Sequence, residues 1–151
     1  MEEKYLLAEE LKEERNYQRR PHICGLFFYQ NLGEFTMKYS ESLKKNRDFQ
    51  NVYKTGKSMG NKYLVMYVVE NQLNRNRLGI SVSKKVGNSV VRHRLTRLIR
   101  ESYRLKEEQF QCGYDIVVIG RAGAKDKGYK EIESAFIHLG HLHNIIYEPM
   151  G

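Results

Sequence analysis

A long helical pattern stands between two strand patterns in the second half of the chain, and this order limits the folds open to it. Residues 77–83 alternate Leu, Ile and Val with Gly and Ser, as in a strand with one buried face. The helical pattern begins at Asn88 or Ser89 and ends near Lys106. The short apolar run 114–120 then fits a central strand. We therefore predict a helix that packs on a small sheet.

Other segments complete the predicted fold. Residues 63–70 are rich in β-forming Tyr and Val, and we predict that they pair with 77–83 as an antiparallel hairpin across a polar turn. Asn46 is a good N-cap for a helix over 47–55, and a final helix spans about 129–143. The predicted class is α+β, a single small, mostly antiparallel sheet packed with about three helices.

The positive charge of the chain is concentrated after residue 36. The chain of 151 residues carries a formal net charge of +8. Residues 1–36 hold five basic and seven acidic side chains, a net charge of −2, whereas residues 37–151 hold 21 basic and 11 acidic ones, a net charge of +10. This excess favours a polyanionic partner, because phosphates attract Lys and Arg and release counterions on binding.

The predicted helix separates apolar from basic side chains. On a helical wheel, one arc holds Val91, Leu95, Leu98, Ile99 and Leu105, and the opposite side holds Arg97, Arg100 and Arg104. Seven cations, five of them Arg, fall within residues 84–104, and only Glu101 dilutes their charge. A merely solvated face is the alternative, but such a face normally mixes signs. The pattern favours a phosphate-binding surface, because the planar guanidinium suits phosphate.

Residues 84–104, KKVGNSVVRHRLTRLIRESYR, closely resemble the signature of the bacterial ribonuclease P protein subunit. The resemblance extends from about Met37 to the last helix and includes segments 43–56, 78–83 and 115–122. It implies an αβββαβα-like order of elements. It also implies a left-handed βαβ crossover around the basic helix, whereas the general rule for parallel strands is a right-handed one.

In that family the catalytic subunit is an RNA, and the protein assists it in endonucleolytic removal of the 5′ leader from precursor transfer RNA. The resemblance thus implies two RNA partners, no membrane or small-molecule substrate, no catalytic side chain, no cofactor bound by the protein alone, and Mg²⁺ at the RNA active site. The positions implied to contact the catalytic RNA are Lys84, Lys85, Asn88, Arg92, Arg94, Arg97 and Arg100. Those implied to form a cleft for the single-stranded leader are Phe49, Tyr53, Val65 and Tyr67.

The residue types of the implied cleft suit this role, because aromatic faces stack on unpaired bases at about 1–3 kcal/mol per base. Ordinary core packing is the alternative for Phe49 and Tyr53, which stand one helical turn apart. Two positions depart from the family pattern. His93 stands where the family usually has Asn, and Thr96 where it usually has Lys. Thr96 removes one cation from the basic face, while His93 can still donate hydrogen bonds or stack.

Residues 1–36 lie outside the resemblance, and the predicted domain covers 37–151. Glu2 to Arg15 predicts a short charged helix, and the residues after it have no clear periodicity. We expect these 36 residues to be an upstream extension produced by too early a start codon, with Met37 the true start. The acidic first residues and the absence of a long apolar run predict a cytoplasmic protein.

Two other functions stay open from the residues alone. A ribosomal or other general RNA-binding protein would have the same size and charge. A self-sufficient nuclease would need clustered metal ligands, and His138, His141 and His143 lack the glutamate of a HExxH site, so we expect no metal site. Arg121 stands in a Gly-rich turn that lacks the spacing of a dinucleotide loop, where it could face a phosphate.

Overall fold

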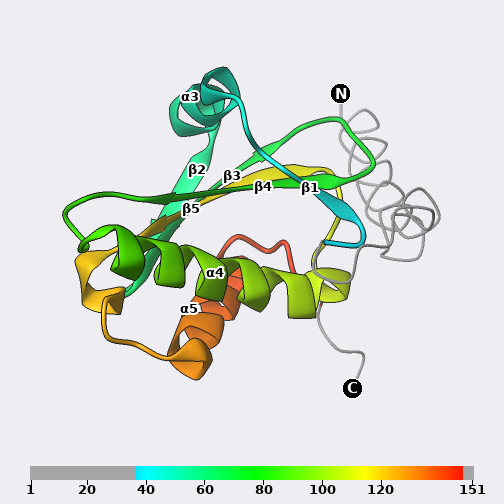
Figure 1. The fold of residues 1–151 in the computed structure, drawn as a ribbon. Helices are drawn as coiled ribbons and strands as arrows, with labels where there is room; N and C mark the ends of the chain where they lie inside the picture. The colour runs from blue at the N-terminus through cyan, green and yellow to red at the C-terminus, as the bar shows by residue number, and fades with distance from the viewer. Residues whose placement is uncertain (1–36, 148–151) are drawn as a thin grey trace, which may run out of the picture.

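The computed structural model describes residues 37–147, so the predicted extension and its helix lie outside the described residues. One five-stranded sheet and its covering helices make up this part of the chain (Figure 1). The elements follow one another as β1 (Ser40–Ser42), α3 (Asn46–Thr55), β2 (Lys57–Gly60), β3 (Leu64–Glu70), β4 (Asn76–Val82), α4 (Ser89–Lys106), η1 (Glu107–Gln109), β5 (Tyr114–Gly120), η2 (Ala122–Ala124) and α5 (Tyr129–Leu142). After β1, their order confirms the αβββαβα-like prediction.

The sheet is mixed, which corrects the expectation of a mostly antiparallel one. Its strand order is β1-β4-β5-β3-β2, with β4 parallel to both β1 and β5, and β3 antiparallel to both β5 and β2. The predicted hairpin of β3 with β4 is wrong, because β5 lies between them. Strand β5 lies in the middle of the sheet, and its apolar run Ile116, Val117 and Val118 is fully buried on both faces. The left hand of the β4–α4–β5 crossover stays a prediction.

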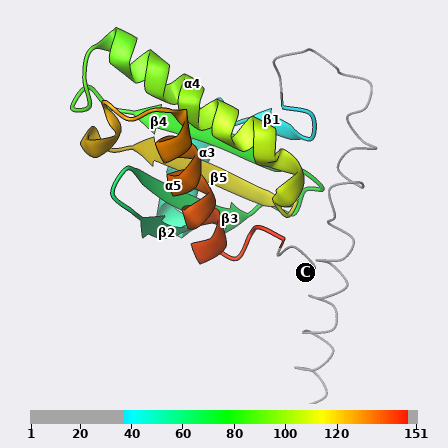
Figure 2. The ribbon, with the colours of Figure 1, turned by 90° about the horizontal axis from the view of Figure 1, so that it is seen from below.

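The two faces of the sheet carry different layers. Helices α4 and α5 cover one face, and α3 lies against the other (Figures 1 and 2). The larger core lies under α4 and α5, where Tyr103, Phe110 and Phe136 form a cluster of fully buried rings with centroids 5.1 to 6.0 Å apart. The smaller core under α3 contains Leu43, Val52 and Val117. None of the described helices combines the length and apolar character that a membrane crossing requires.

The helices form largely where the sequence predicts them, and their caps differ. Asn88 is the N-cap of α4, and its side chain accepts a hydrogen bond of 3.0 Å from the backbone N–H of Val91. The predicted cap Asn46 is instead the first residue of α3, and Lys45 occupies the cap position without a side-chain hydrogen bond. In α5, Gly140 lies against the Ile146 side chain, which a Cβ at this position would displace.

Strand β1 was not predicted, and a distant carboxylate holds it in place. Glu107 is 5% exposed, and its two oxygens accept hydrogen bonds from the backbone N–H groups of Lys38 (2.9 Å) and Tyr39 (2.8 Å). At the same end of the sheet, the Ser40 hydroxyl lies 2.6 Å from the Tyr103 hydroxyl. A three-residue strand with such long-range partners leaves no periodic signal in the sequence.

The anchor of β1 predicts a pH dependence of folding. Burial raises the pKa of Glu107 above its ordinary value of 4.5, so the folded state holds this proton more tightly than the unfolded chain. The stabilisation by the proton is complete below the ordinary pKa and is lost as pH rises through the raised one. We expect the free energy of unfolding to fall with rising pH across this window relative to a Glu107→Gln variant. Urea denaturation across pH measures it, with Glu70→Gln as the exposed control. Parallel profiles for all three proteins would contradict it.

Candidate nucleic-acid interface

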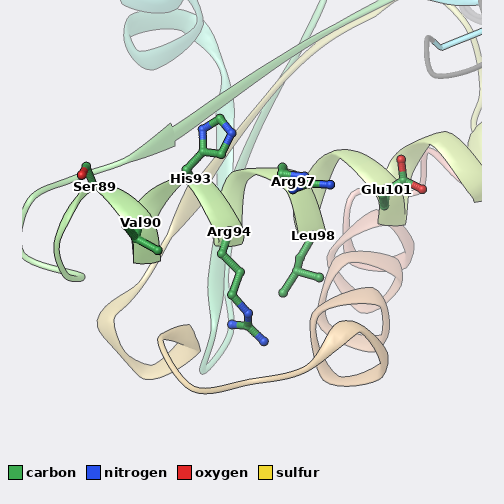
Figure 3. Close-up of a pocket in the computed structure, with 7 residues that line it drawn as sticks. All are labelled: Ser89, Val90, His93, Arg94, Arg97, Leu98 and Glu101. Carbon is green, nitrogen blue, oxygen red and sulfur yellow. The ribbon is translucent and has the colours of Figure 1, made fainter.

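The outer surface of α4 presents most of the predicted cations. Lys84, Lys85, Arg94, Arg97 and Arg100 are exposed. A shallow hollow of about 620 Å³ runs along this surface, lined by Ser89, Val90, His93, Arg94, Arg97, Leu98 and Glu101 (Figure 3). Val90 is 74% exposed within it, an apolar side chain among cations. The hollow therefore offers both charge and apolar contact to a ligand.

The buried side of α4 is rotated relative to the predicted wheel. Leu95, Ile99 and Tyr103 are buried, so the centre of the packed arc lies nearer Ile99 than Val91. This rotation leaves Leu105 55% exposed, which corrects its place on the predicted apolar arc. It also draws Arg92 partly inward, where its Nε is buried and has no hydrogen-bond partner within residues 37–147.

One predicted cation of the basic face is already paired. Arg104 donates two hydrogen bonds to the Glu101 carboxylate, at 2.9 and 2.8 Å. These bonds lower the pKa of Glu101, so it stays charged and offsets Arg104. The C-terminal end of this face therefore carries both positive and negative charges, as expected for a merely solvated helix face. The uncompensated charge lies further toward the N-terminus of α4.

The two positions that depart from the family pattern, His93 and Thr96, differ in their contacts. The Thr96 hydroxyl donates a hydrogen bond of 2.9 Å to the backbone carbonyl of Arg92, one turn earlier in α4. His93 is exposed and leaves the helix on a different side from Arg94, which extends toward the connection between η2 and α5 (Figure 3). There Arg94 donates a hydrogen bond of 3.0 Å to the backbone carbonyl of Lys127.

The four residues predicted to bind a leader lie on the face of the sheet that α3 covers. The rings of Phe49 and Tyr53 lie 6.4 Å apart, and those of Tyr53 and Tyr67 lie 5.2 Å apart in an edge-on arrangement. Val65 stands two positions from Tyr67 on β3 and so lies on the same face. Phe49, Tyr53, Val65 and Tyr67 are each half-buried, between a core position and a free surface. Their rings pack on the small core and still reach solvent.

A glycine and an ion-pair network position these aromatic rings, and the sequence did not reveal either. A Cβ at Gly79 would lie 2.7 Å from the Phe49 ring, so the ring rests directly on the β4 backbone. Arg77 donates to both carboxylate oxygens of Asp115, at 2.8 and 2.5 Å, and its Nη1 lies 3.5 Å from Asp48 Oδ2 on α3. The hydrogen bonds with Asp115 raise the pKa of Arg77, which keeps it charged. The network fixes α3 against the sheet.

Comparison with known proteins places this arrangement in a family. Residues 37–143 match the family Ribonuclease P. The chain belongs to this family. The ribonuclease P protein component of Lachnoclostridium phytofermentans is 66% identical over 107 residues, which cover 71% of this chain and 92% of the relative. That of Alkaliphilus metalliredigens is 55% identical over 103 residues, 68% of this chain and 93% of the relative.

Solved structures of the family share the fold. The Staphylococcus aureus RNase P protein has a TM-score of 0.66 and 38% identity, and the match covers 70% of this chain and 97% of that one. The Thermotoga maritima RNase P protein has a TM-score of 0.62 and 33% identity, covering 66% of this chain and 94% of that one. These likenesses confirm the α+β prediction. As a member of the family, the protein is a subunit of ribonuclease P, an endoribonuclease of transfer RNA 5′ processing.

The three histidines singled out in the sequence, His138, His141 and His143, lie at or near the end of α5. Within residues 37–147, no group of three or more His, Cys, Asp or Glu side chains is arranged to hold a metal ion. The histidines near the end of α5 have separate partners: His138 Nδ1 lies 3.3 Å from Asn61 Nδ2, and His143 Nε2 lies 3.0 Å from the Met66 carbonyl. Burial lowers the pKa of His143, so its ring is neutral at pH 7.

Proposed function

We propose that this ribonuclease P protein binds the catalytic RNA through α4 and the 5′ leader of precursor transfer RNA through the aromatic face beside α3. The observation that carries the proposal is the exposed run of unpaired cations on α4, together with half-buried rings on the far side of the sheet. Two separate surfaces suit two RNA partners. In this arrangement the protein positions RNA, and no side chain breaks a bond.

The α4 surface suits the phosphates of a folded RNA. Arg97 and Arg100 are exposed, and neither takes part in an ion pair within residues 37–147. A guanidinium can give two parallel hydrogen bonds to one phosphate. The buried Nε of Arg92 supports a role in which its outer nitrogens reach the RNA while its stem packs on the helix. Lys84, Lys85, Asn88 and Arg94 extend the same surface around the start of α4.

The aromatic face suits an unpaired strand. Half-exposed rings can stack on bases without selecting a sequence, and leaders of different transfer RNAs differ in sequence. The edge-on contact of Tyr53 with Tyr67 holds the rings in place before RNA arrives, which lowers the entropy lost on binding. Val65 and Tyr67 would provide the floor of the leader site, and Phe49 and Tyr53 its wall.

In this proposal the RNA, and not the protein, binds the divalent ions. The described residues hold no acidic cluster that would fit such an ion, and Mg²⁺ at the RNA active site would activate the attacking water. The protein contributes by neutralising phosphate repulsion and by holding the leader, so the RNA needs less free Mg²⁺ to bind its substrate.

A reconstitution experiment tests the function. Precursor transfer RNA is incubated at low Mg²⁺ with the catalytic RNA from the same cells, with the protein, and with both. We expect 5′ leader removal to be fast only with both, because the protein supplies cations that low Mg²⁺ does not. Cleavage by the protein alone would indicate a self-sufficient nuclease. Equal cleavage with and without the protein would indicate a general RNA-binding protein.

Removal of the Phe49 ring should weaken substrates that carry a leader. We expect Phe49→Ala to reduce the affinity of the holoenzyme for precursor transfer RNA by about 1–3 kcal/mol, because one stacked base loses its partner. Affinity for mature transfer RNA should not change. Fluorescence titration of both RNAs measures the difference, with the exposed neighbour Gln50→Ala as control. Equal losses for both RNAs would show that Phe49 serves only as core.

A further inference from the structure

A second hollow lies away from α4, where the turn between β2 and β3 meets α5. Its volume is about 440 Å³, within the range of pockets that hold nucleotide-sized ligands. It is lined by Asn61, Lys62, Tyr63, Lys130, Glu131, Ser134, Ala135 and His138. Neither the α4 surface nor the aromatic face includes any of these residues.

Asn61 fixes the geometry of this hollow. Its Oδ1 accepts hydrogen bonds from the backbone N–H groups of Tyr63 (3.1 Å) and Leu64 (3.0 Å), so the orientation of its amide is determined. Its Nδ2 therefore donates to the Ala135 carbonyl at 2.9 Å and faces His138 Nδ1 at 3.3 Å. These hydrogen bonds join the turn between β2 and β3 to α5.

Four cations lie in or beside the hollow, which is also lined by Glu131. The ammonium groups of Lys62 and Lys127 lie 5.8 and 5.6 Å from the centroid of the Tyr63 ring. Lys130 lines the hollow, and Arg121 Nη1 donates to the Asn61 carbonyl at 2.8 Å. None of these four forms an ion pair within the part of the chain that the structure describes. Positive charges gathered around one hollow attract an anion.

The hollow is joined to the α4 surface. The hydrogen bond of 3.0 Å from Arg94 to the Lys127 carbonyl connects α4 with the segment that carries the Lys127 ammonium. Positive charge therefore continues from Arg97 and Arg94 across Lys127 to Lys62. An RNA strand lying on α4 could follow this charge without leaving the protein surface.

We propose that the hollow formed by residues 61–63 and the first half of α5 binds a backbone phosphate of RNA, as an extension of the α4 surface. Lys62 and Lys130 supply the charge, Arg121 and Lys127 add to it from the side, and the Ser134 hydroxyl and the His138 ring offer further hydrogen-bond donors. The inference rests on the proposed function, since it takes RNA to be the ligand of α4. The phosphate belongs either to the catalytic RNA or to precursor transfer RNA.

A double variant, Lys62→Ala with Lys130→Ala, tests the site. Both side chains are exposed, so the fold should persist, which circular dichroism checks. One arm measures binding of the catalytic RNA alone against salt concentration, and the other measures binding of precursor transfer RNA to the reconstituted holoenzyme. We expect about tenfold weaker binding and a salt slope smaller by about 1 to 2 in one arm. The arm that responds identifies the RNA that provides the phosphate.

Two controls separate this site from general charge and from the function of α4. Lys38→Ala with Lys57→Ala removes the same charge outside the hollow, the α4 surface and the aromatic face, and should have a much smaller effect. Glu131→Gln removes the acid that lines the hollow and should strengthen binding. If the two double variants weaken both RNAs equally, or neither does so, the site is overturned. If Arg97→Ala is also without effect on the catalytic RNA, the proposed role of α4 fails as well.

Discussion

Phe136→Ala is expected to lower the free energy of unfolding by about 3–5 kcal/mol, the usual cost of removing a fully buried ring. Phe136 has no exposed surface, and its ring centroid lies 6.0 Å from that of Tyr103 and 5.6 Å from that of Phe110. These rings join α5, α4 and the segment before β5, so a cavity there loosens every layer on this face. Urea denaturation followed by circular dichroism measures the change.

The loss in the free energy of unfolding should depend on how deeply the removed side chain is buried. Leu142→Ala on the same helix is a matched control, because Leu142 is 40% exposed and its loss should cost well under 1 kcal/mol. Phe136→Leu keeps most of the volume and should fall between the two. Equal small losses for Phe136→Ala and Leu142→Ala would show that the ring cluster does not stabilise the fold.

The fold could be predicted where its signals are local. Helical periodicity placed 47–55 and 129–143 within a residue of α3 and α5, and the apolar run 114–120 coincides with β5. Strand pairing is not a local property, because alternation in 63–70 and 77–83 is equally compatible with a hairpin and with a strand inserted between them. The two edge strands β1 and β2 are short and largely polar. The place of β1 depends on a distant partner, Glu107, which no pattern within the strand can indicate.

The residues of the candidate site could be predicted from the sequence better than their arrangement in space. The wheel separated the faces of α4 but missed a rotation of the buried arc, because that arc is set by the sheet beneath it. The pairing of Arg104 with Glu101 is a three-residue spacing visible in the sequence, yet its effect on the charge of the face was underestimated. The hollow beside Tyr63 combines segments that are distant in sequence, and only Arg121 within its surroundings was noticed.

Loss of the Arg97 and Arg100 guanidinium groups of α4 should strongly weaken assembly of the holoenzyme at physiological salt. We expect Arg97→Ala with Arg100→Ala to weaken binding of the catalytic RNA about 100-fold, since each charged hydrogen bond contributes about 1.5–3 kcal/mol. The slope of affinity against salt should fall by about 1 to 2 as the phosphate contacts disappear. Titration of labelled catalytic RNA at several salt concentrations measures both quantities.

Affinity and salt slope, measured together in matched variants, distinguish specific phosphate binding from a general effect of charge. Glu101→Ala with Arg104→Ala removes an existing ion pair from the same helix without changing net charge, so its salt slope should stay that of the natural protein. Arg97→Lys with Arg100→Lys keeps the charge but loses the planar fork, so the slope should persist while affinity falls. If the lysine variant binds as tightly as the natural protein while the alanine variant does not, α4 attracts RNA only through its positive charge. Full affinity in the alanine variant would place the RNA on another surface.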